Sequence, residues 1–449
     1  MTPAADAHDA YAAFREPGYR LMLGGAVLAS TGLEMQATAI GWEILERTDS
    51  ALVIGYTGLA QFLPVLLLVL PAGQLVDRHD RKRLFQLAQA VMACASLGLA
   101  YLSYTRGPVD LMLACLVLSG CGRALSAPAR VSLYPQLVPA SALPNAVAWN
   151  STGWQVASVS GPALAGLLIY LAPYWVAYAV AAGGALACIL LLTPVRPRAS
   201  VGRPLNRSFA SMAAGVRFVW NTKLLLSAIT LDLFAVLLGG ATALLPIFAR
   251  DILHVGKLGL GFLRASPAVG ALCMALVMAH RPPLRRPGAA LLLAVAGFGL
   301  ATIGFGLSEN LILSFAMLFL TGALDNVSVV VRGTLMQMLT PDDMRGRVSS
   351  VNSLFISSSN ELGVFESGAT AAAFGPIKSV VGGGIGTLAV VALVWWRWPQ
   401  LAAVGELHRL GEERREVGDE LYATIRQPAP TTIPRSETPD DRVGPDPPR

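Results

Sequence analysis

A short charged stretch separates two long apolar runs near the start of the chain. Residues 51–72 and residues 84–104 contain no Asp, Glu, Lys or Arg. Each run is long enough to cross a hydrocarbon core of about 30 Å as a helix. Residues 73–83, with the sequence GQLVDRHDRKR, join them and contain four Arg or Lys residues. Because short loops rich in Arg and Lys stay in the cytosol, the stretch predicts a cytosolic loop between two membrane-spanning helices.

The composition indicates many such helices. Of the 449 residues, 54% are hydrophobic and 14% are charged, which is too apolar for one water-soluble core of this length. The net charge of +6 does not indicate nucleic-acid binding, because the cations lie in loops between apolar runs. The five cysteines lie inside apolar runs without metal-ligand spacing, so we expect neither disulfides nor a metal site. No phosphate-binding G-x-x-x-x-G-K-S/T motif is present, and we expect no cofactor.

The apolar runs predict an all-α polytopic membrane protein with about twelve spans. The expected spans lie near residues 20–44, 51–73, 84–105, 109–130, 146–170, 172–193, 225–249, 258–280, 288–308, 311–333, 348–374 and 377–398. Residues 1–19 have no apolar segment typical of a cleavable signal peptide. Lys and Arg concentrate in alternate loops, which predicts that both termini are cytosolic. The expected location is the cytoplasmic (inner) membrane.

Changes in composition divide the chain into five segments. These are a cytosolic N-terminal segment (1–18), a six-helix bundle (19–193), a basic cytosolic linker (194–224), a second six-helix bundle (225–398) and a cytosolic tail (399–449). We expect an interfacial helix near residues 209–220, a surface helix at 406–426 and a disordered end at 427–449. The two halves match at an offset of 202 positions, which predicts a duplicated six-helix unit. The matching pairs are Arg130 and Arg332, Pro139 and Pro341, Asn150 and Asn352, Ser151 and Ser353, Gly161 and Gly363, and Gly166 and Gly368.

Several motifs resemble those of the major facilitator superfamily of secondary transporters. The loop signature between its second and third helices is matched by Gly73, Leu75, Asp77, Arg78, Arg81 and Lys82. Residues 157–166, with Gly161, Pro162 and Gly166, are similar to the fifth-helix motif of its drug and proton antiporters, although Ala157 replaces the leading glycine. Residues 126–139 and 341–348 resemble the bacterial enterobactin-exporter-like subfamily, also called transmembrane secretion effectors. The resemblance covers residues 15–398.

The resemblance implies a secondary active transporter and not an enzyme. It implies export of small amphipathic molecules, such as siderophores or drugs, by proton antiport with alternating access. The expected partners are a small-molecule substrate, protons and the lipid bilayer, and the expected state is a monomer. Two alternatives remain open. A lysophospholipid flippase would also need an apolar cavity with few charges, and a non-transporting scaffold would dock a soluble partner through residues 405–449.

Ionisable side chains within spans are costly, so they are the candidates for function. Glu34 is the first candidate for the coupling proton and Asp232 the reserve. Because helices one, four, seven and ten line the cavity in this superfamily, the resemblance adds four cavity or substrate residues: Gln36, Arg123, Asp325 and Asn326. Arg123 and Asp325 are equivalent at the offset of 202, so we expect them to pair directly or through substrate in one conformational state. Glu361 and Glu366 lie about 140° apart on one helix and cannot share a face.

The resemblance also implies a conformational switch at the charged loop. Its residues are Gly73, Asp77, Arg78, Arg81, Lys82 and Arg130. Asp77 is expected to face the N-terminus of the eleventh span near residues 348–350, where the helix dipole favours an anion, with Arg130 nearby. This contact would hold the two halves together on the cytosolic side. The corresponding loop of the second half, residues 280–287, keeps three arginines but has no Asp.

Overall fold

The computed structural model describes residues 9, 11–198, 209–282, 284–341 and 344–403, which contain helices and no strand. The long helices are α1 (Pro17–Thr48), α2 (Ala51–Arg78), α3 (Arg81–Tyr104), α4 (Val109–Leu137), α5 (Leu143–Leu171), α6 (Tyr174–Leu192), α8 (Lys223–Leu238), α10 (Gly256–His280), α11 (Pro287–Gly306), α12 (Leu311–Leu339), α13 (Arg345–Phe374) and α14 (Pro376–Arg397). Shorter elements are η1 (Ala12–Arg15), η2 (Ala140–Ala142), α7 (Phe209–Asn221), η3 (Ala241–Leu244), α9 (Leu245–Ile247), the π-helical turn η4 (Phe248–Ile252) and α15 (Pro399–Ala403). The expected helix at residues 406–426 and the tail lie outside the described residues.

Within the described chain, ten segments are long and apolar enough to cross a membrane. α1 and α13 are equally long but fall outside this group, because polar and ionisable residues, including Glu34 in α1 and Glu361 in α13, lower their mean hydropathy. Both helices pack against several others, α1 against α5 and α6, and α13 against α2 and α8. Their charged groups can therefore face protein instead of lipid. The predicted all-α polytopic membrane fold is confirmed.

One expected span is interrupted. The sequence predicts a continuous helix over residues 225–249, but α8 ends at Leu238 and the chain passes through Gly239 and Gly240 into η3, α9 and η4. Two adjacent glycines weaken a helix, and Pro246 cannot donate a backbone hydrogen bond. A Cβ on Gly239 would come within 2.5 Å of the Phe298 ring, so the close packing at the break requires glycine.

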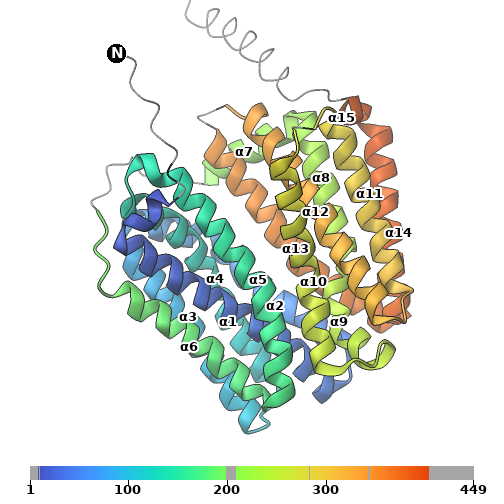
Figure 1. Ribbon diagram of the computed structural model, residues 1–449, viewed down its shortest axis with the longest axis horizontal. Coiled ribbons are helices and arrows are strands. Elements are labelled where there is room, and N and C mark those ends of the chain that lie inside the picture. The colour runs from blue at the N-terminus through green and yellow to red at the C-terminus, as the bar shows by residue number, and fades with distance from the viewer. Residues whose placement is uncertain (1–8, 10, 199–208, 283, 342–343, 404–449) are drawn as a thin grey trace, which may run out of the picture.

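The long helices form two groups, which lie beside each other in Figure 1. In the first half, α1 packs against α5 and α6, α2 against α4, and α3 against α4 and α6. In the second half, α12 packs against α10 and α11, α11 against α14, and α13 against α8. Two crossings join the halves, since α2 lies along α13 and α5 lies along α10. A helix is present at the position of the predicted interfacial helix, namely α7, which packs against α8 and α13.

The two halves repeat one pattern at the offset found in the sequence. α4 and α12 both have 29 residues, and both their first residues (109 and 311) and their last residues (137 and 339) lie 202 positions apart. The two crossings are also equivalent under this offset, because α5 of the first half corresponds to α13 of the second and α2 corresponds to α10. At each crossing two glycines face each other, Gly166 against Gly261 and Gly55 against Gly368. A Cβ on Gly166 would lie 2.7 Å from the Gly261 Cα, so these backbones touch directly.

The halves are packed together at one end of the molecule. We call the end that carries the loop at Asp49 the Asp49 end, and the opposite end, with the loop at Asp80, the Asp80 end. At the Asp49 end one buried cluster contains residues of both halves, such as Ile44 with Leu244 and Phe248. The clusters toward the Asp80 end are separate, one within residues 13–195 and two within residues 219–401. In Figure 1, α7 and α15 mark the Asp80 end at the top, and α9 marks the Asp49 end at the bottom.

Candidate functional site

A cavity of about 330 Å³ lies between the two halves. Its wall is built by α1, α2, α3, α4 and α5 of the first half and by η3, α9, α10 and α13 of the second. Five ionisable side chains line it, namely Glu34, Arg123, Arg130, Arg264 and Glu361. Because the wall comes from both halves, any relative movement of the halves changes the cavity's shape and the spacing of these charges.

An ion pair connects the halves within this cavity. The Arg123 Nη1 on α4 donates to the Glu361 Oε1 on α13 at 2.7 Å and to the Gln61 Oε1 on α2 at 3.0 Å. The side chains of Arg123 and Glu361 are 33% and 16% exposed, so water reaches the pair only in part. Arg264 on α10 is half-buried and interacts electrostatically with Glu34 and Glu361. The site is thus a four-charge cluster (Glu34, Arg123, Arg264 and Glu361) drawn from four helices.

The fifth-helix motif positions Glu34. A Cβ on Gly161 would lie 2.5 Å from the Glu34 Cβ and 3.0 Å from the Thr31 carbonyl oxygen, so only glycine allows α5 to approach α1 this closely. On the same helix the Pro162 carbonyl oxygen would lie 2.9 Å from a Cβ on Gly261. The residues Gly161, Pro162 and Gly166 therefore hold α5 between α1 and α10.

Two expectations about α12 and α8 do not hold in this structure. Arg123 pairs with Glu361 and not with Asp325, because α2 and α13 cross directly at the depth of Arg123. Asp325 and Asn326 are half-buried on α12 and do not line the cavity. Asp232 on α8 contacts neither the cavity nor a cation on α4. Its carboxylate pairs instead with Arg332 of α12, and both side chains are 5% exposed.

Gln36 also departs from the expectation that it lines the cavity. Its side chain is buried between α1 and α3, where its Oε1 accepts a hydrogen bond from the Ser96 Oγ at 2.6 Å. Gln36 and Glu34 are two residues apart on a helix, so they point in different directions. The hydrogen bond satisfies a buried amide and joins two helices of the first half.

The charged loop is ordered, but its expected contact with α13 is absent in this conformation. Among the described residues Asp77 has no ion pair or side-chain hydrogen bond, and Val348 in the first turn of α13 packs against Val219 of α7. Asp80, which the motif does not include, caps α3 by accepting from the Lys82 backbone N–H at 2.9 Å. The Lys82 Nζ donates to the carbonyl oxygens of Thr193 and Val195 at 2.8 and 2.7 Å.

The other switch residues take different positions. Gly73 is buried, Arg78 is exposed and Arg81 is half-buried with its Nε unpartnered. Arg130 lines the cavity and makes no ion pair with any described residue. Lys82 therefore ties the start of α3 to the segment that follows α6, while Arg130 faces the space between the halves.

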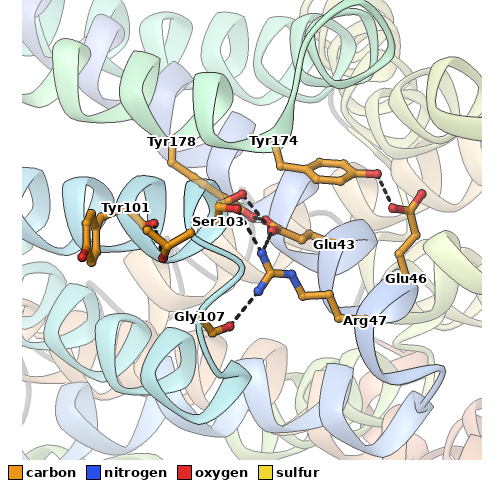
Figure 2. Close-up of polar contacts among 9 residues, drawn as sticks. Glu43, Glu46, Arg47, Tyr101, Ser103, Gly107, Tyr174 and Tyr178 are labelled. Carbon is orange, nitrogen blue, oxygen red and sulfur yellow. Dashed lines mark hydrogen bonds and ion pairs between the residues drawn. The ribbon is translucent and has the colours of Figure 1, made fainter.

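A polar cluster that the sequence interpretation missed lies at the Asp49 end (Figure 2). Glu43 on α1 is 1% exposed, and its carboxylate pairs with Arg47 and accepts from the Ser103 Oγ at 2.8 Å and the Tyr178 hydroxyl at 2.6 Å. Glu46 accepts from the Tyr174 hydroxyl at 2.6 Å. These bonds join α1, α3 and α6 of the first half.

The same cluster reaches the second half. The Lys257 Nζ at the start of α10 lies 3.8 Å from the Glu46 Oε1 and 4.4 Å from the centre of the Tyr174 ring. Arg250 of η4 pairs with Asp49 at the end of α1. We call these two interactions, Lys257 with Glu46 and Arg250 with Asp49, the Asp49-end contacts. They add ion pairing to the apolar cluster that closes this end.

Arg264 could have been found from the sequence. Arg264 is the one charged residue within residues 258–279, and the rule that selected Glu34 applies to it equally. Glu361, an ionisable residue within an expected span, is a candidate by the same rule. What the sequence could not supply was the crossing of α13 with α2, which brings Glu361 to Arg123.

Comparisons with known proteins agree with this architecture. Residues 8–410 match a family model described as transmembrane secretion effector. The enterobactin exporter EntS of Shigella dysenteriae is 27% identical over 383 residues, covering 84% of this chain and 91% of that protein, and EntS of Escherichia coli matches equally well. A crystal structure of a bacterial homologue of the human lysosomal transporter Spinster, in an inward-facing, unoccupied conformation, superimposes with a TM-score of 0.68 and 16% identity, covering 86% of this chain and 98% of that one. That likeness concerns the fold.

Proposed function

This chain belongs to the transmembrane secretion effector family of major facilitator transporters, and from that premise we propose that it exports small amphipathic molecules from the cytoplasm by proton antiport. The observation that carries the proposal is the four-charge cluster in a cavity shared by both halves. Ionisable groups at such a depth are costly, and their usual role in transporters is to bind ions or substrate. The name of the EntS relatives suggests siderophore-like cargo.

The orientation of the chain gives the direction of access. The loop at Asp80 and the linker after α6 are rich in Arg and Lys, so the Asp80 end is cytosolic and both termini lie on that side. The apolar cluster and the Asp49-end contacts close the opposite side. The conformation described here is then the inward-facing one, in which substrate enters from the cytosol.

Protonation of Glu34 supplies the coupling step. With all four groups ionised, the two carboxylates of the four-charge cluster balance its two arginines. A proton on Glu34 leaves one positive charge in excess and frees Arg264 from one of its two carboxylate partners. Arg264 and Glu34 belong to different halves, so the proton changes the attraction between the halves. Protonation thereby shifts the equilibrium between the conformations open to the two sides, which couples that equilibrium to the proton gradient.

Asp77 completes the cycle at the other end. When the Asp80 end closes, Asp77 is proposed to reach the N-terminal turn of α13, with Arg130 nearby, as the superfamily resemblance implies. The Asp49-end contacts must then open. The protein works as a monomer in this scheme, because each alternative contact lies within one chain.

The test is transport by the purified protein in proteoliposomes with an imposed pH difference. Labelled enterobactin, amphipathic drugs and lysophospholipid serve as probes, and the Glu34→Gln variant is compared with Glu309→Gln, an exposed loop residue. We expect uphill accumulation of at least one non-lipid probe by the wild type and by Glu309→Gln. Glu34→Gln should retain only downhill exchange. Uphill transport by Glu34→Gln would refute coupling at this residue, and transport of lysophospholipid alone would favour a flippase.

A further inference from the structure

The loop between α10 and α11 is the second-half counterpart of the charged loop, but its arginines lack the partners found there. Arg281, Arg285 and Arg286 are exposed, and none makes an ion pair or a side-chain hydrogen bond with a described residue. In the first half, by contrast, Arg83 lies 3.8 Å from the Asp80 carboxylate. The cations of the second-half loop are therefore available to a negatively charged group outside the described chain.

The elements around this loop cannot supply such a group themselves. Residues 252–308, which include α10 and α11, contain no Asp or Glu, and neither do residues 367–405, which include α14 and α15. The neighbouring helices α8 and α12 have one Asp each. Asp232 is buried against Arg332, and Asp325 is half-buried within its span. These four elements thus carry positive charge at the Asp80 end without an acidic residue of their own.

Tryptophans lie at the same end of α14. Trp395 and Trp396 are 62% and 78% exposed. Arg397 is also exposed, and its guanidinium carbon lies 5.7 Å from the centre of the Trp398 ring. Tryptophans at the end of a membrane-spanning helix lie at the depth of the lipid headgroups, because the indole has both an apolar body and a polar N–H. Arg397 is therefore at headgroup depth.

The packing of α11 against α14 brings the loop arginines to this position. The two helices run antiparallel, since a Cβ on Gly306, the last residue of α11, would lie 3.0 Å from Val380 in the first turns of α14. At the opposite ends of these helices, Leu291 and Val394 belong to one buried cluster. Arg286, which precedes α11, therefore lies at the level of the last turn of α14. Figure 1 shows α11 and α14 at the edge of the second group that faces away from the first.

We propose that Arg285, Arg286 and Arg397 bind the headgroup of an anionic phospholipid of the cytosolic leaflet, with Trp395 and Trp396 beside its glycerol and upper acyl region. A guanidinium pairs with a phosphate through two parallel hydrogen bonds. Each cation near a membrane surface should raise the affinity for an anionic lipid about fivefold. A lipid fits better than a soluble anion, because only a lipid also covers the exposed indoles. Binding requires no transport, so it is tested apart from the export function.

The test measures lipid binding to the full-length protein in detergent by native mass spectrometry. Dioleoylphosphatidylglycerol is anionic, and dioleoylphosphatidylcholine has the same acyl chains but no net charge. We expect the wild type to bind phosphatidylglycerol about tenfold more tightly. Arg285→Gln with Arg286→Gln should remove most of this preference. The matched control, Arg15→Gln with Arg83→Gln, removes two cations of the first half that already pair with aspartates, and should keep the preference.

Further measurements decide between charge, lipid and other anions. Arg285→Lys with Arg286→Lys preserves the charge and should keep most of the preference. The proposal is overturned by equal binding of the two lipids, by an unaltered preference in Arg285→Gln with Arg286→Gln, or by displacement of phosphatidylglycerol by an equal concentration of inorganic phosphate. A lower melting temperature of the Gln variant in lipid-free detergent, without any lipid preference in the wild type, would also overturn it. That result would assign the arginines to the acidic residues of segment 404–449.

Discussion

Arg123 and Glu361 join the two halves of the protein, with the Nη1 of one 2.7 Å from the Oε1 of the other. The pair lies beside a close approach of α2 and α13, where a Cβ on Gly58 would come within 2.6 Å of the Glu361 carbonyl oxygen. Separation of these helices would break the ion pair, so its strength contributes to the balance between conformations.

The first prediction concerns this pair. Arg123→Gln and Glu361→Gln should each reduce transport, and the losses should not add, because either change leaves one unpaired charge in the cavity. The expected coupling energy from a double-mutant cycle is about 1 kcal/mol. Initial transport rates in proteoliposomes provide the measurement. As a control, the double-mutant cycle of Arg123→Gln with Asp325→Asn should show no coupling energy. A coupling energy larger than that of the Arg123 and Glu361 cycle would instead support the pairing of Arg123 with Asp325 that the sequence suggested.

The second prediction concerns Gly161, the glycine of α5 that packs against Glu34 on α1. Gly161→Ala should force α5 away from α1 and lower both the apparent melting temperature and the transport rate, because the added Cβ would overlap Glu34 and Thr31. Such overpacking typically costs about 1 to 3 kcal/mol. Gly183→Ala is the control, because a Cβ at Gly183 would have no neighbour within 4 Å. Equal melting temperatures for the two variants would argue against a close α1–α5 contact.

The third prediction concerns the Asp49-end contacts. Lys257→Gln removes the cation near Glu46 and the Tyr174 ring, so the state open at the Asp49 end should become more populated. Partly exposed pairs are worth about 0.5 kcal/mol, which corresponds to roughly a twofold change. Spin-label distances across this end provide the measurement, and Lys378→Gln, at an exposed position, is the control. A narrower distance distribution in Lys257→Gln would contradict the assignment.

The fourth prediction concerns Asp77. Asp77 makes no ion pair with any described residue in this conformation, so Asp77→Asn should leave the stability of this conformation unchanged. The substitution should destabilise the alternative conformation, in which the Asp80 end is closed and Asp77 meets the N-terminus of α13. Cysteines placed in the cavity wall should then react faster with reagents added from the Asp80 side. Asp110→Asn, at an exposed position in the first turn of α4, should not change the labelling rate. Slower labelling in Asp77→Asn would oppose the proposed switch.

The fifth prediction concerns the buried pair of Asp232 and Arg332. Asp232→Asn should lower the apparent melting temperature strongly, because it leaves the Arg332 charge buried without its partner, at a cost of about 3 kcal/mol. Asp232→Leu combined with Arg332→Met should recover much of the loss, since an apolar pair of similar size avoids the unpaired charge. Heating the purified protein and following its monodispersity gives the measurement. A mild effect of Asp232→Asn with complete loss of transport would instead indicate the reserve proton-coupling role.

The sequence predicted where most of the long helices lie, but not which side chains on different helices contact each other. Apolar runs depend on local composition, and they placed the first residues of α4 and α12 correctly, although the helices continue to Leu137 and Leu339, beyond the expected ends at 130 and 333. Gly239 and Gly240 could have indicated the break after α8, but a uniformly apolar run conceals such an interruption. The pairing of Arg123 with Glu361 depends on contacts between residues 238 positions apart, which a hydropathy pattern does not contain.

The same limit explains why Gln36 and Asp232 do not line the cavity as expected. Both were selected because polar residues within spans are rare, but that rule does not distinguish a residue facing the cavity from one bonded to a neighbouring helix. Gln36 finds Ser96, and Asp232 finds Arg332, on helices of their own half. Among the described residues Glu34 makes no side-chain hydrogen bond or ion pair of this kind, and it interacts electrostatically with Arg123 of its own half and Arg264 of the other.

The two glycine crossings affect how the halves can move. Where Gly166 meets Gly261 and Gly55 meets Gly368, backbone touches backbone with no side chain between them. A rotation about the line through these two points would require no rotamer change and would expose no apolar side chain at either point. The barrier to such a rotation would therefore arise from the groups around the crossings, namely the ion pairs, such as that of Lys257 with Glu46, and the apolar cluster that contains Ile54 and Leu260. We therefore expect the two glycine crossings to set the axis about which the halves rotate, and the charged residues to set the relative populations of the conformations.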